Sequence, residues 1–107
     1  MASRIVYPVI VKTHFFHHKV VPAFVQVDLS GGRTAQVLFT NRSREAFVLQ
    51  LPSAVFATTT APLGPDSSVA VDVREDAPVG VYEYQIDAPR TGLEAKGSSR
   101  PDIIIVR

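Results

Sequence analysis

Hydrophobic and polar residues alternate along much of this chain, and a period of two is typical of β-strands with one buried face. Val25, Val27 and Leu29 fall on one face of such a strand. The polar residues Gln26 and Asp28 lie between them and face the other way. The pattern predicts a half-buried strand here and wherever it recurs. It recurs in residues 35–39, 47–51, 69–73 and 82–86.

Two further predicted strands depart from this alternation. Residues 5–11 are rich in Val and Ile but include Pro8, which has no N–H to donate to a neighbouring strand. We therefore expect an edge strand or a bulge at that point. Residues 103–106, Ile-Ile-Ile-Val, contain no polar position, so we expect this strand to be covered on both faces.

Turn-forming residues separate these strands at intervals of about 8 to 12 residues, which is the spacing of an all-β sandwich or barrel. Ser30-Gly31-Gly32 predicts a tight hairpin turn with positive φ. Residues 52–61 leave room for one turn of helix at most, and residues 89–101 form one long loop. We predict a single domain over residues 1–107, an antiparallel Greek-key β-sandwich of seven or eight strands.

The order of these signals resembles that of one β-sandwich family. A Pro-containing strand start at residues 21–24 is followed by Gly31-Gly32 and by Val-Leu-Phe-Thr-Asn at residues 37–41. Residues 77–84, Ala-Pro-Val-Gly-Val-Tyr-Glu-Tyr, are similar to the Gly-x-Tyr-x-Phe strand that leads to a copper-binding loop. Over residues 20–107 the chain resembles the cupredoxins, the blue-copper proteins. The resemblance implies a cupredoxin-like fold.

The same resemblance places the copper ligands of the family on this chain. The first His ligand falls on Ala46, the Cys ligand on Ile86 and the second His near Pro89, while the axial Met falls near Leu93 or Glu94. A blue-copper centre takes its thiolate from Cys, supported by two imidazoles. The resemblance therefore implies a cupredoxin-like β-sandwich that lacks the copper ligands and carries out no copper electron transfer.

The composition also argues against a copper centre, and it excludes several other kinds of site. The chain has no Cys, and its single Met is the first residue, so disulfides, thiolate metal sites and cysteine nucleophiles are excluded. Eleven basic residues balance ten acidic ones without a basic run, which gives no footprint for nucleic acid or an anionic membrane surface. No apolar run approaches a membrane span, and no signal peptide precedes the first strand. We expect a cytoplasmic protein or a mature chain whose leader has been removed.

Three histidines form the one concentrated group of metal-ligating side chains. His14, His17 and His18 would suit Zn, Cu or Ni, because imidazole is the commonest metal ligand in proteins. On a regular strand His14 and His18 share one face and His17 points to the other. All three could converge only where the chain bends, so the alternative is a surface cluster at the end of a strand.

Basic residues in two loops suggest a second site. In a sandwich of this topology the loop after residues 35–39 and the loop before the last strand lie at the same end. Arg42, Arg44, Arg90 and Lys96 would then form a modest basic rim, which could meet a carboxylate or phosphate group on a partner. The alternative is ordinary solubilising charge.

Signals for catalysis are weak. The serines lie in turn-like sequence without a Gly-x-Ser-x-Gly elbow, and the carboxylates are scattered along the strands. We therefore expect no enzyme, no cofactor and no catalytic residues. The sequence favours a protein-interaction or structural module that meets a protein partner or a second copy through a sheet edge near Pro8 or an end loop. The alternative function is metal binding by His14, His17 and His18.

Overall fold

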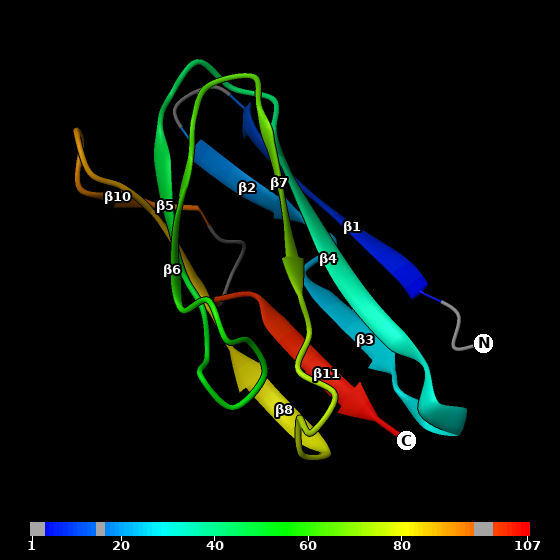
Figure 1. Ribbon diagram of the computed structural model, residues 1–107. Coiled ribbons are helices and arrows are strands. Elements are labelled where there is room, and N and C mark those ends of the chain that lie inside the picture. The colour runs from blue at the N-terminus through cyan, green and yellow to red at the C-terminus, as the bar shows by residue number, and fades with distance from the viewer. Residues whose placement is uncertain (1–3, 15–16, 96–99) are drawn as a thin grey trace.

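The computed structural model describes residues 4–14, 17–95 and 100–107. Within these ranges the chain forms eleven strands and one short 3-10 turn, and Figure 1 shows their arrangement. The strands are β1 (Arg4–His14), β2 (His17–Val21), β3 (Phe24–Asp28), β4 (Thr34–Asn41), β5 (Phe47–Gln50), β6 (Thr60–Leu63), β7 (Ser68–Asp72), β8 (Gly80–Glu83), β9 (Gln85–Ala88), β10 (Leu93–Glu94) and β11 (Asp102–Val106). The 3-10 turn η1 spans Ser30–Gly32.

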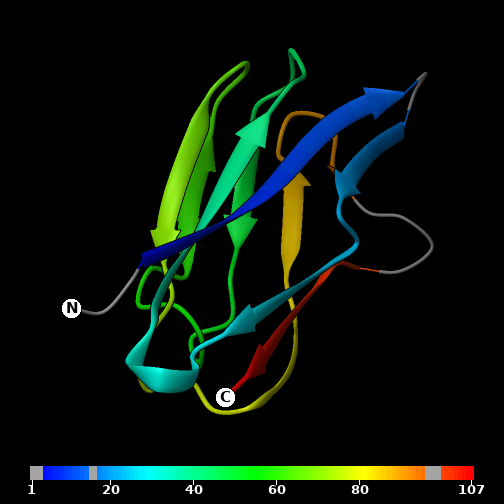
Figure 2. The same ribbon diagram turned by 90° about the vertical axis from the view of Figure 1, so that its right-hand side faces the viewer.

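The strands build a two-layered sandwich. One layer is the sheet β2-β1-β4-β7. The other layer is made of two adjoining sheets, β3-β11-β8 and β10-β9-β5-β6, which share one stretch of chain because only Tyr84 separates β8 from β9. Figure 2 shows the layers from the side. The all-β sandwich predicted from the alternation is confirmed.

The number of strands and their directions differ from the prediction. Two pairings are parallel, β1 with β4 and β3 with β11, so the sandwich is not wholly antiparallel. The predicted strand at residues 82–86 is two strands, because the chain leaves β11 at Tyr84 and joins β5. Alternation shows which side of a strand is buried but carries no information on its partner, so it predicted too few strands and missed the parallel pairs.

The glycine turn has the predicted backbone but a different role. Gly31 and Gly32 adopt φ values of 66° and 73°, the left-handed region that glycine enters without steric penalty. The predicted hairpin is wrong, since β3 pairs with β11 and β4 pairs with β1. The turn therefore carries the chain from one layer of the sandwich to the other.

The prediction of an edge at Pro8 is confirmed. Pro8 lies opposite Leu38 of β4, while β2 pairs with β1 only from Ile10 onward. Among the described strands, this half of β1 therefore has a neighbour on one side only. A proline fits there because its missing N–H interrupts no ladder on the open side.

β11 contradicts the expectation of a strand covered on both faces. Ile103 and Ile105 are completely buried, whereas Ile104 and Val106 are half-buried on the outer face. Val81 of the neighbouring β8 lies opposite Ile104 and is 65% exposed. No described element covers this outer face, because the sandwich has only two layers.

The connecting segments also differ in detail from their predictions. The long loop at residues 89–101 contains β10, which pairs with β9 and makes residues 89–92 a hairpin turn. Residues 52–61 contain one helical turn, as the sequence had allowed: the N–H groups of Val55 and Phe56 donate to the Pro52 carbonyl at 3.1 and 3.0 Å. Phe56 also forms an isolated bridge with Val73. Among the described residues, no helix has the length and hydrophobicity of a membrane span.

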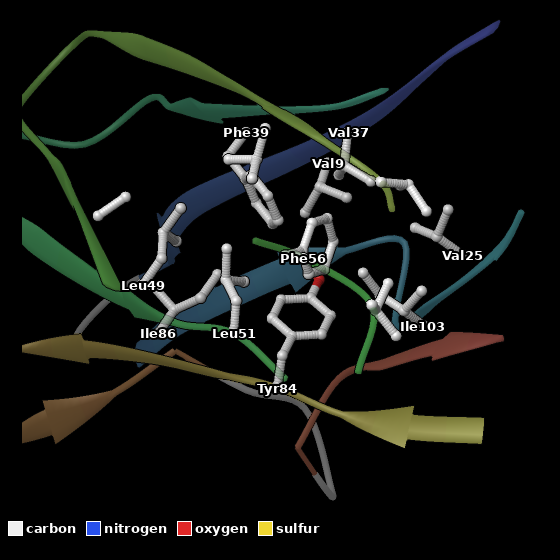
Figure 3. Packing of buried hydrophobic residues seen from close by; sticks show 14 of the residues in the cluster. Val9, Val25, Val37, Phe39, Leu49, Leu51, Phe56, Tyr84, Ile86 and Ile103 are labelled. Carbon is white, nitrogen blue, oxygen red and sulfur yellow. The ribbon is translucent and has the colours of Figure 1, made fainter. Parts of the chain in front are cut away.

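The core fills the space between the layers, as Figure 3 shows. Phe39 of β4 and Tyr84 meet edge to face, with ring centroids 5.8 Å apart and an interplanar angle of 71°. Such pairs are favourable beyond the area that they bury. The Tyr84 hydroxyl points toward Phe56 and has no hydrogen-bond partner among the described residues. Burial raises the pKa of this phenol above its ordinary value.

Candidate binding site at the loop end

Several connections gather at one end of the sandwich, which we call the loop end. It comprises the β4–β5 loop (residues 42–46), the β6–β7 turn (residues 64–67) and the β9–β10 turn (residues 89–92). Figure 2 shows these connections at the top of the molecule, opposite η1 and the end of β11. Because β4 and β9 belong to different layers, the loop end brings together residues far apart in the sequence.

Asn41 organises the β4–β5 loop from within. Its buried side-chain amide donates hydrogen bonds to the carbonyl oxygens of Glu45 at 2.7 Å and Gly64 at 3.0 Å. Its side-chain oxygen accepts bonds from the backbone N–H of Ser43 at 2.9 Å and from the Ser43 hydroxyl at 2.7 Å. Short polar side chains commonly hold turns in this way. The loop is therefore tied both to itself and to the β6–β7 turn.

Glu45 connects this loop to the β9–β10 turn. Its Oε1 and Oε2 accept hydrogen bonds from Arg90 Nε at 3.2 Å and Nη2 at 2.8 Å, a two-point ion pair between residues 45 positions apart. The Glu45 side chain is 11% exposed and that of Arg90 is 80% exposed. Arg90 hydrogen bonding holds the pKa of the Glu45 carboxyl below its ordinary value, and His18 contributes in the same direction. The pair presents a positioned guanidinium at the surface.

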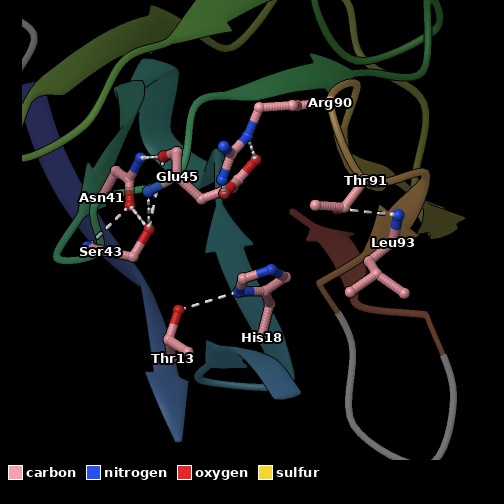
Figure 4. A network of polar contacts seen from close by, with 8 residues as sticks. All are labelled: Thr13, His18, Asn41, Ser43, Glu45, Arg90, Thr91 and Leu93. Carbon is pink, nitrogen blue, oxygen red and sulfur yellow. Dashed lines mark hydrogen bonds and ion pairs between the residues drawn. The ribbon is translucent and has the colours of Figure 1, made fainter. Parts of the chain in front are cut away.

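A pocket of about 410 Å³ opens beside this ion pair. His18 forms part of its wall: the ring lies 2.9 Å from the Thr13 hydroxyl through Nδ1 and packs edge to face on Phe47, at a centroid distance of 5.0 Å. Figure 4 shows Thr13 and His18 together with the Glu45–Arg90 ion pair. We call this cavity the loop-end pocket. Its lining residues are Thr13, His18, Ser43, Arg44, Glu45 and Arg90.

The charges of the loop-end pocket are unbalanced. Arg90 and Glu45 neutralise each other, whereas the exposed Arg44 makes no hydrogen bond or ion pair with any residue that the structure describes. Leaving His18 aside, the lining therefore carries one net positive charge. The arrangement can therefore accept an anionic group.

The predicted basic rim is confirmed for two of its four members. Arg44 and Arg90 come from different loops and line the same pocket. Arg42 is exposed beside them but does not line the pocket, and its backbone N–H donates to the Val11 carbonyl at 2.8 Å. Lys96 lies outside the described residues.

The three histidines do not lie on one continuous strand, which was the arrangement considered from the sequence. The chain reverses between β1 and β2, and the register sets His14 opposite His17 in the backbone ladder. The His14 side chain lies outside what the structure describes. His17 and His18 follow one another in β2, so they point to opposite faces, with His17 exposed and His18 in the loop-end pocket. The described residues contain no group of three potential metal-ligating side chains.

The positions on which the sequence resemblance places copper ligands lie close to this pocket along the chain. Ala46 follows Glu45, and Pro89 precedes Arg90, so the ion pair joins the direct neighbours of two ligand positions. Ile86 is completely buried in β9, and Leu93 and Glu94 form β10. The loop end therefore holds an ion pair and a basic pocket beside positions that hold Ala and Pro in this chain.

Sequence reasoning missed Glu45 and Thr13 as members of the site. The spacing Asn41-x-Ser43-x-Glu45 marks a hydrogen-bonded turn, and that signal could have drawn attention to the loop. It could not identify Arg90 as the partner of Glu45, because only the antiparallel pairing of β5 with β9 brings them together.

The comparisons with known proteins match the chain through its structure alone. No family model and no curated protein sequence matches it. A laccase from Pediococcus acidilactici is 16% identical, with a TM-score of 0.56 over 96% of this chain and 26% of that one. A variant laccase from B. aclada is 14% identical, with a TM-score of 0.57 over 99% of this chain and 23% of that one.

A multicopper oxidase from Pediococcus acidilactici superposes similarly, with 12% identity and a TM-score of 0.54. This chain spans about a quarter of the length of these oxidases. At such low identity the likeness concerns the fold alone. The strand order and these superpositions together show that the chain has a cupredoxin-like fold.

Proposed function

We propose that this protein is a non-catalytic protein-interaction module that binds its partner through the loop end. The observation that carries the proposal is the ion pair between Glu45 and Arg90. It joins the loop before β5 to the turn after β9 and holds an exposed arginine at the rim of a pocket. Arginine in a defined orientation is common at interaction surfaces, where its planar fork of donors recognises a partner.

Two features support the non-catalytic part of the proposal. The Ser43 hydroxyl donates to Asn41 and also accepts a bond from the Glu45 backbone N–H at 3.2 Å, so it is engaged in holding the loop. The pKa of Glu45 is lowered by Arg90, whereas a general base works best when its pKa lies near the operating pH. Both groups are better suited to building a rigid surface than to moving protons.

The open half of β1 is a weaker candidate for the interaction surface. Binding at a sheet edge depends on backbone N–H and C=O groups that can extend the ladder. Pro8 removes one of those donors in the middle of the open stretch, and proline on an edge strand is a common device against pairing with other chains. This contrast favours the loop end over the edge.

The test compares partner capture by wild-type protein and by variants at the loop end. We expect the double variant Arg44→Ala, Arg90→Ala to lose a captured partner that the wild type retains. Arg74→Ala is the matched control. Arg74 does not line the pocket, and it forms a similar two-point ion pair with Asp76, at 2.9 and 3.1 Å. Light scattering after size-exclusion chromatography tests whether a second copy is that partner. A strict monomer that captures nothing would overturn the proposal, as would capture that the double variant leaves unchanged.

A further inference from the structure

Resting on the proposed function, we infer that the loop-end pocket binds a carboxylate group of the partner protein between Arg44 and Arg90. The hydrogen-bond donors, the charge and the walls of the pocket all support binding of a carboxylate.

Arg90 supplies hydrogen-bond donors that are already held in position. A guanidinium carries five N–H groups in a rigid plane. Glu45 accepts from the Nε–H and from one Nη2–H, and Arg90 makes no other hydrogen bond with a described residue. The Nη1 group and the second Nη2–H are therefore left to bind a ligand, and Glu45 holds the plane in place. Restricting the side chain before binding reduces the entropy lost when the ligand arrives.

Arg44 supplies the positive charge. It lines the same pocket without a partner in the described structure, so its guanidinium keeps its full donor set. Leaving His18 aside, the net charge of the lining is one positive unit, which a single carboxylate neutralises. A phosphate carries close to two negative charges near neutral pH and would leave the pocket negative. The charge balance therefore favours a carboxylate.

His18 adds a further donor on the opposite wall. When the Thr13 hydroxyl donates to Nδ1, the neutral ring carries its proton on Nε2. Contact with Phe47 holds the ring in position at the pocket wall. A carboxylate in the pocket can thus be reached from both arginines and from the imidazole.

Two other paired arginines show why the loop end is distinct. Arg100 is shared between Glu94 at 2.8 Å and Glu83 at 3.2 Å, so the 290 Å³ pocket that it lines has two acidic neighbours for one base. Arg74 gives two bonds to Asp76 and a third, from Nη1, to the Ser53 carbonyl at 3.3 Å. Neither site combines a positioned arginine with a second, unpaired one.

The experiment titrates the full chain with small carboxylates and follows backbone and arginine side-chain N–H signals by NMR at constant ionic strength. The probes are N-acetylglycine, which represents a C-terminal carboxylate, N-acetylaspartate methylamide, which represents an acidic side chain, and inorganic phosphate. We expect both carboxylates to shift signals of Ser43, Arg44 and Arg90 and to bind more tightly than phosphate. Whichever carboxylate binds more tightly identifies the source of the group.

Two variants test the assignment. Arg44→Ala removes an exposed side chain without a described partner, so it should fold normally and weaken carboxylate binding about threefold to tenfold, as expected for one charge-assisted hydrogen bond. Arg90→Lys keeps the charge but loses the planar fork, and it should weaken binding to a similar extent. Arg74→Ala should leave binding unchanged.

The outcomes separate this inference from the proposed function. Carboxylate binding that Arg44→Ala does not weaken, tighter binding of phosphate, or no shift at the loop end with either carboxylate overturns the inference. If the loop-end variants nevertheless abolish partner capture, the interaction function stands with a different ligand chemistry. If capture is also unaffected, both proposals are wrong.

Discussion

Glu45 is the residue on which the arrangement of the loop end depends. It lies largely out of solvent, and Arg90 satisfies both of its oxygens. A half-exposed ion pair of this kind contributes less to stability than its geometry suggests, because water and salt screen the charges. Its main effect is to hold two loops in one arrangement.

The lowered pKa of Glu45 makes its contribution pH dependent. The pKa is lower in the folded chain than its ordinary value of 4.5, so the ionised form stabilises the fold. That stabilisation is fully present above the ordinary pKa and is lost as the pH falls through the folded value. We expect Glu45→Gln to lower the free energy of unfolding at pH 7, and the difference from wild type to shrink below about pH 4. Urea unfolding at both pH values measures this.

The control for this prediction is Glu75→Gln. The Glu75 side chain is exposed and forms no ion pair with a described residue, so this change should alter stability little at either pH. An effect of Glu45→Gln that is as large at pH 3 as at pH 7 would contradict the electrostatic account.

Tyr84 provides a second prediction at the scale of one residue. The side chain is 2% exposed, and its hydroxyl has no partner in the described structure. Because an unsatisfied buried hydroxyl destabilises a fold, we expect Tyr84→Phe to raise the free energy of unfolding by about 1 kcal/mol. Tyr82→Phe is the matched control, because the Tyr82 hydroxyl donates to the Pro78 carbonyl at 2.8 Å. That change should lower stability by about 1 kcal/mol. A loss of stability in Tyr84→Phe would indicate a hydrogen bond to an internal water.

Among the strands, β11 shows how differently two faces of one element contribute. Ile105 faces the core and is completely buried, while its neighbour Ile104 is half-buried on the outer face. We expect Ile105→Ala to lower the free energy of unfolding by about 3 kcal/mol through lost burial and the cavity that remains. Ile104→Ala should lower it by only about 1 kcal/mol.

Thermal and urea unfolding of the two variants check this expectation. Equal losses would show that the outer face of β11 is covered in solution, as its wholly apolar sequence had suggested. In that case the loss of stability caused by Ile104→Ala should depend on protein concentration, because the cover would come from a second copy of the chain.

At the scale of the whole molecule, the pairing of strands decides which residues can meet. Glu45 lies just before β5 and Arg90 just after β9, and the antiparallel pairing of these two strands brings the ion pair together at one end of the sandwich. The same topology separates His17 from His18 across β2. The fold therefore favours the arginines over the histidines as the binding residues.

The histidine hypothesis leads to a measurable outcome. Protein purified without a His tag should carry only substoichiometric Zn, Cu or Ni, because His17 and His18 point to opposite faces and cannot bind one ion from the same strand. Elemental analysis measures the content. One ion per chain that disappears when His14 and His18 are replaced by Ala would contradict this expectation and restore the metal-binding function.

Much of the fold could be predicted from local patterns. Val25 and Val27 are buried where alternation placed them, and Pro8 lies on an open edge where its missing N–H does no harm. The loop-end prediction succeeded for Arg44 and Arg90 because it rested on topology. It failed for Glu45, since nothing near that residue in the sequence indicates a partner 45 positions away.

The sequence by itself determined the all-β class, the buried face of most strands and the absence of Cys. These properties depend on residue type and on a period of two, both of which are local. The tertiary structure alone decided the parallel pairings, the change of sheet at Tyr84 and the meeting of Glu45 with Arg90. Those depend on which strands become neighbours, and that choice is made by packing two layers around one core.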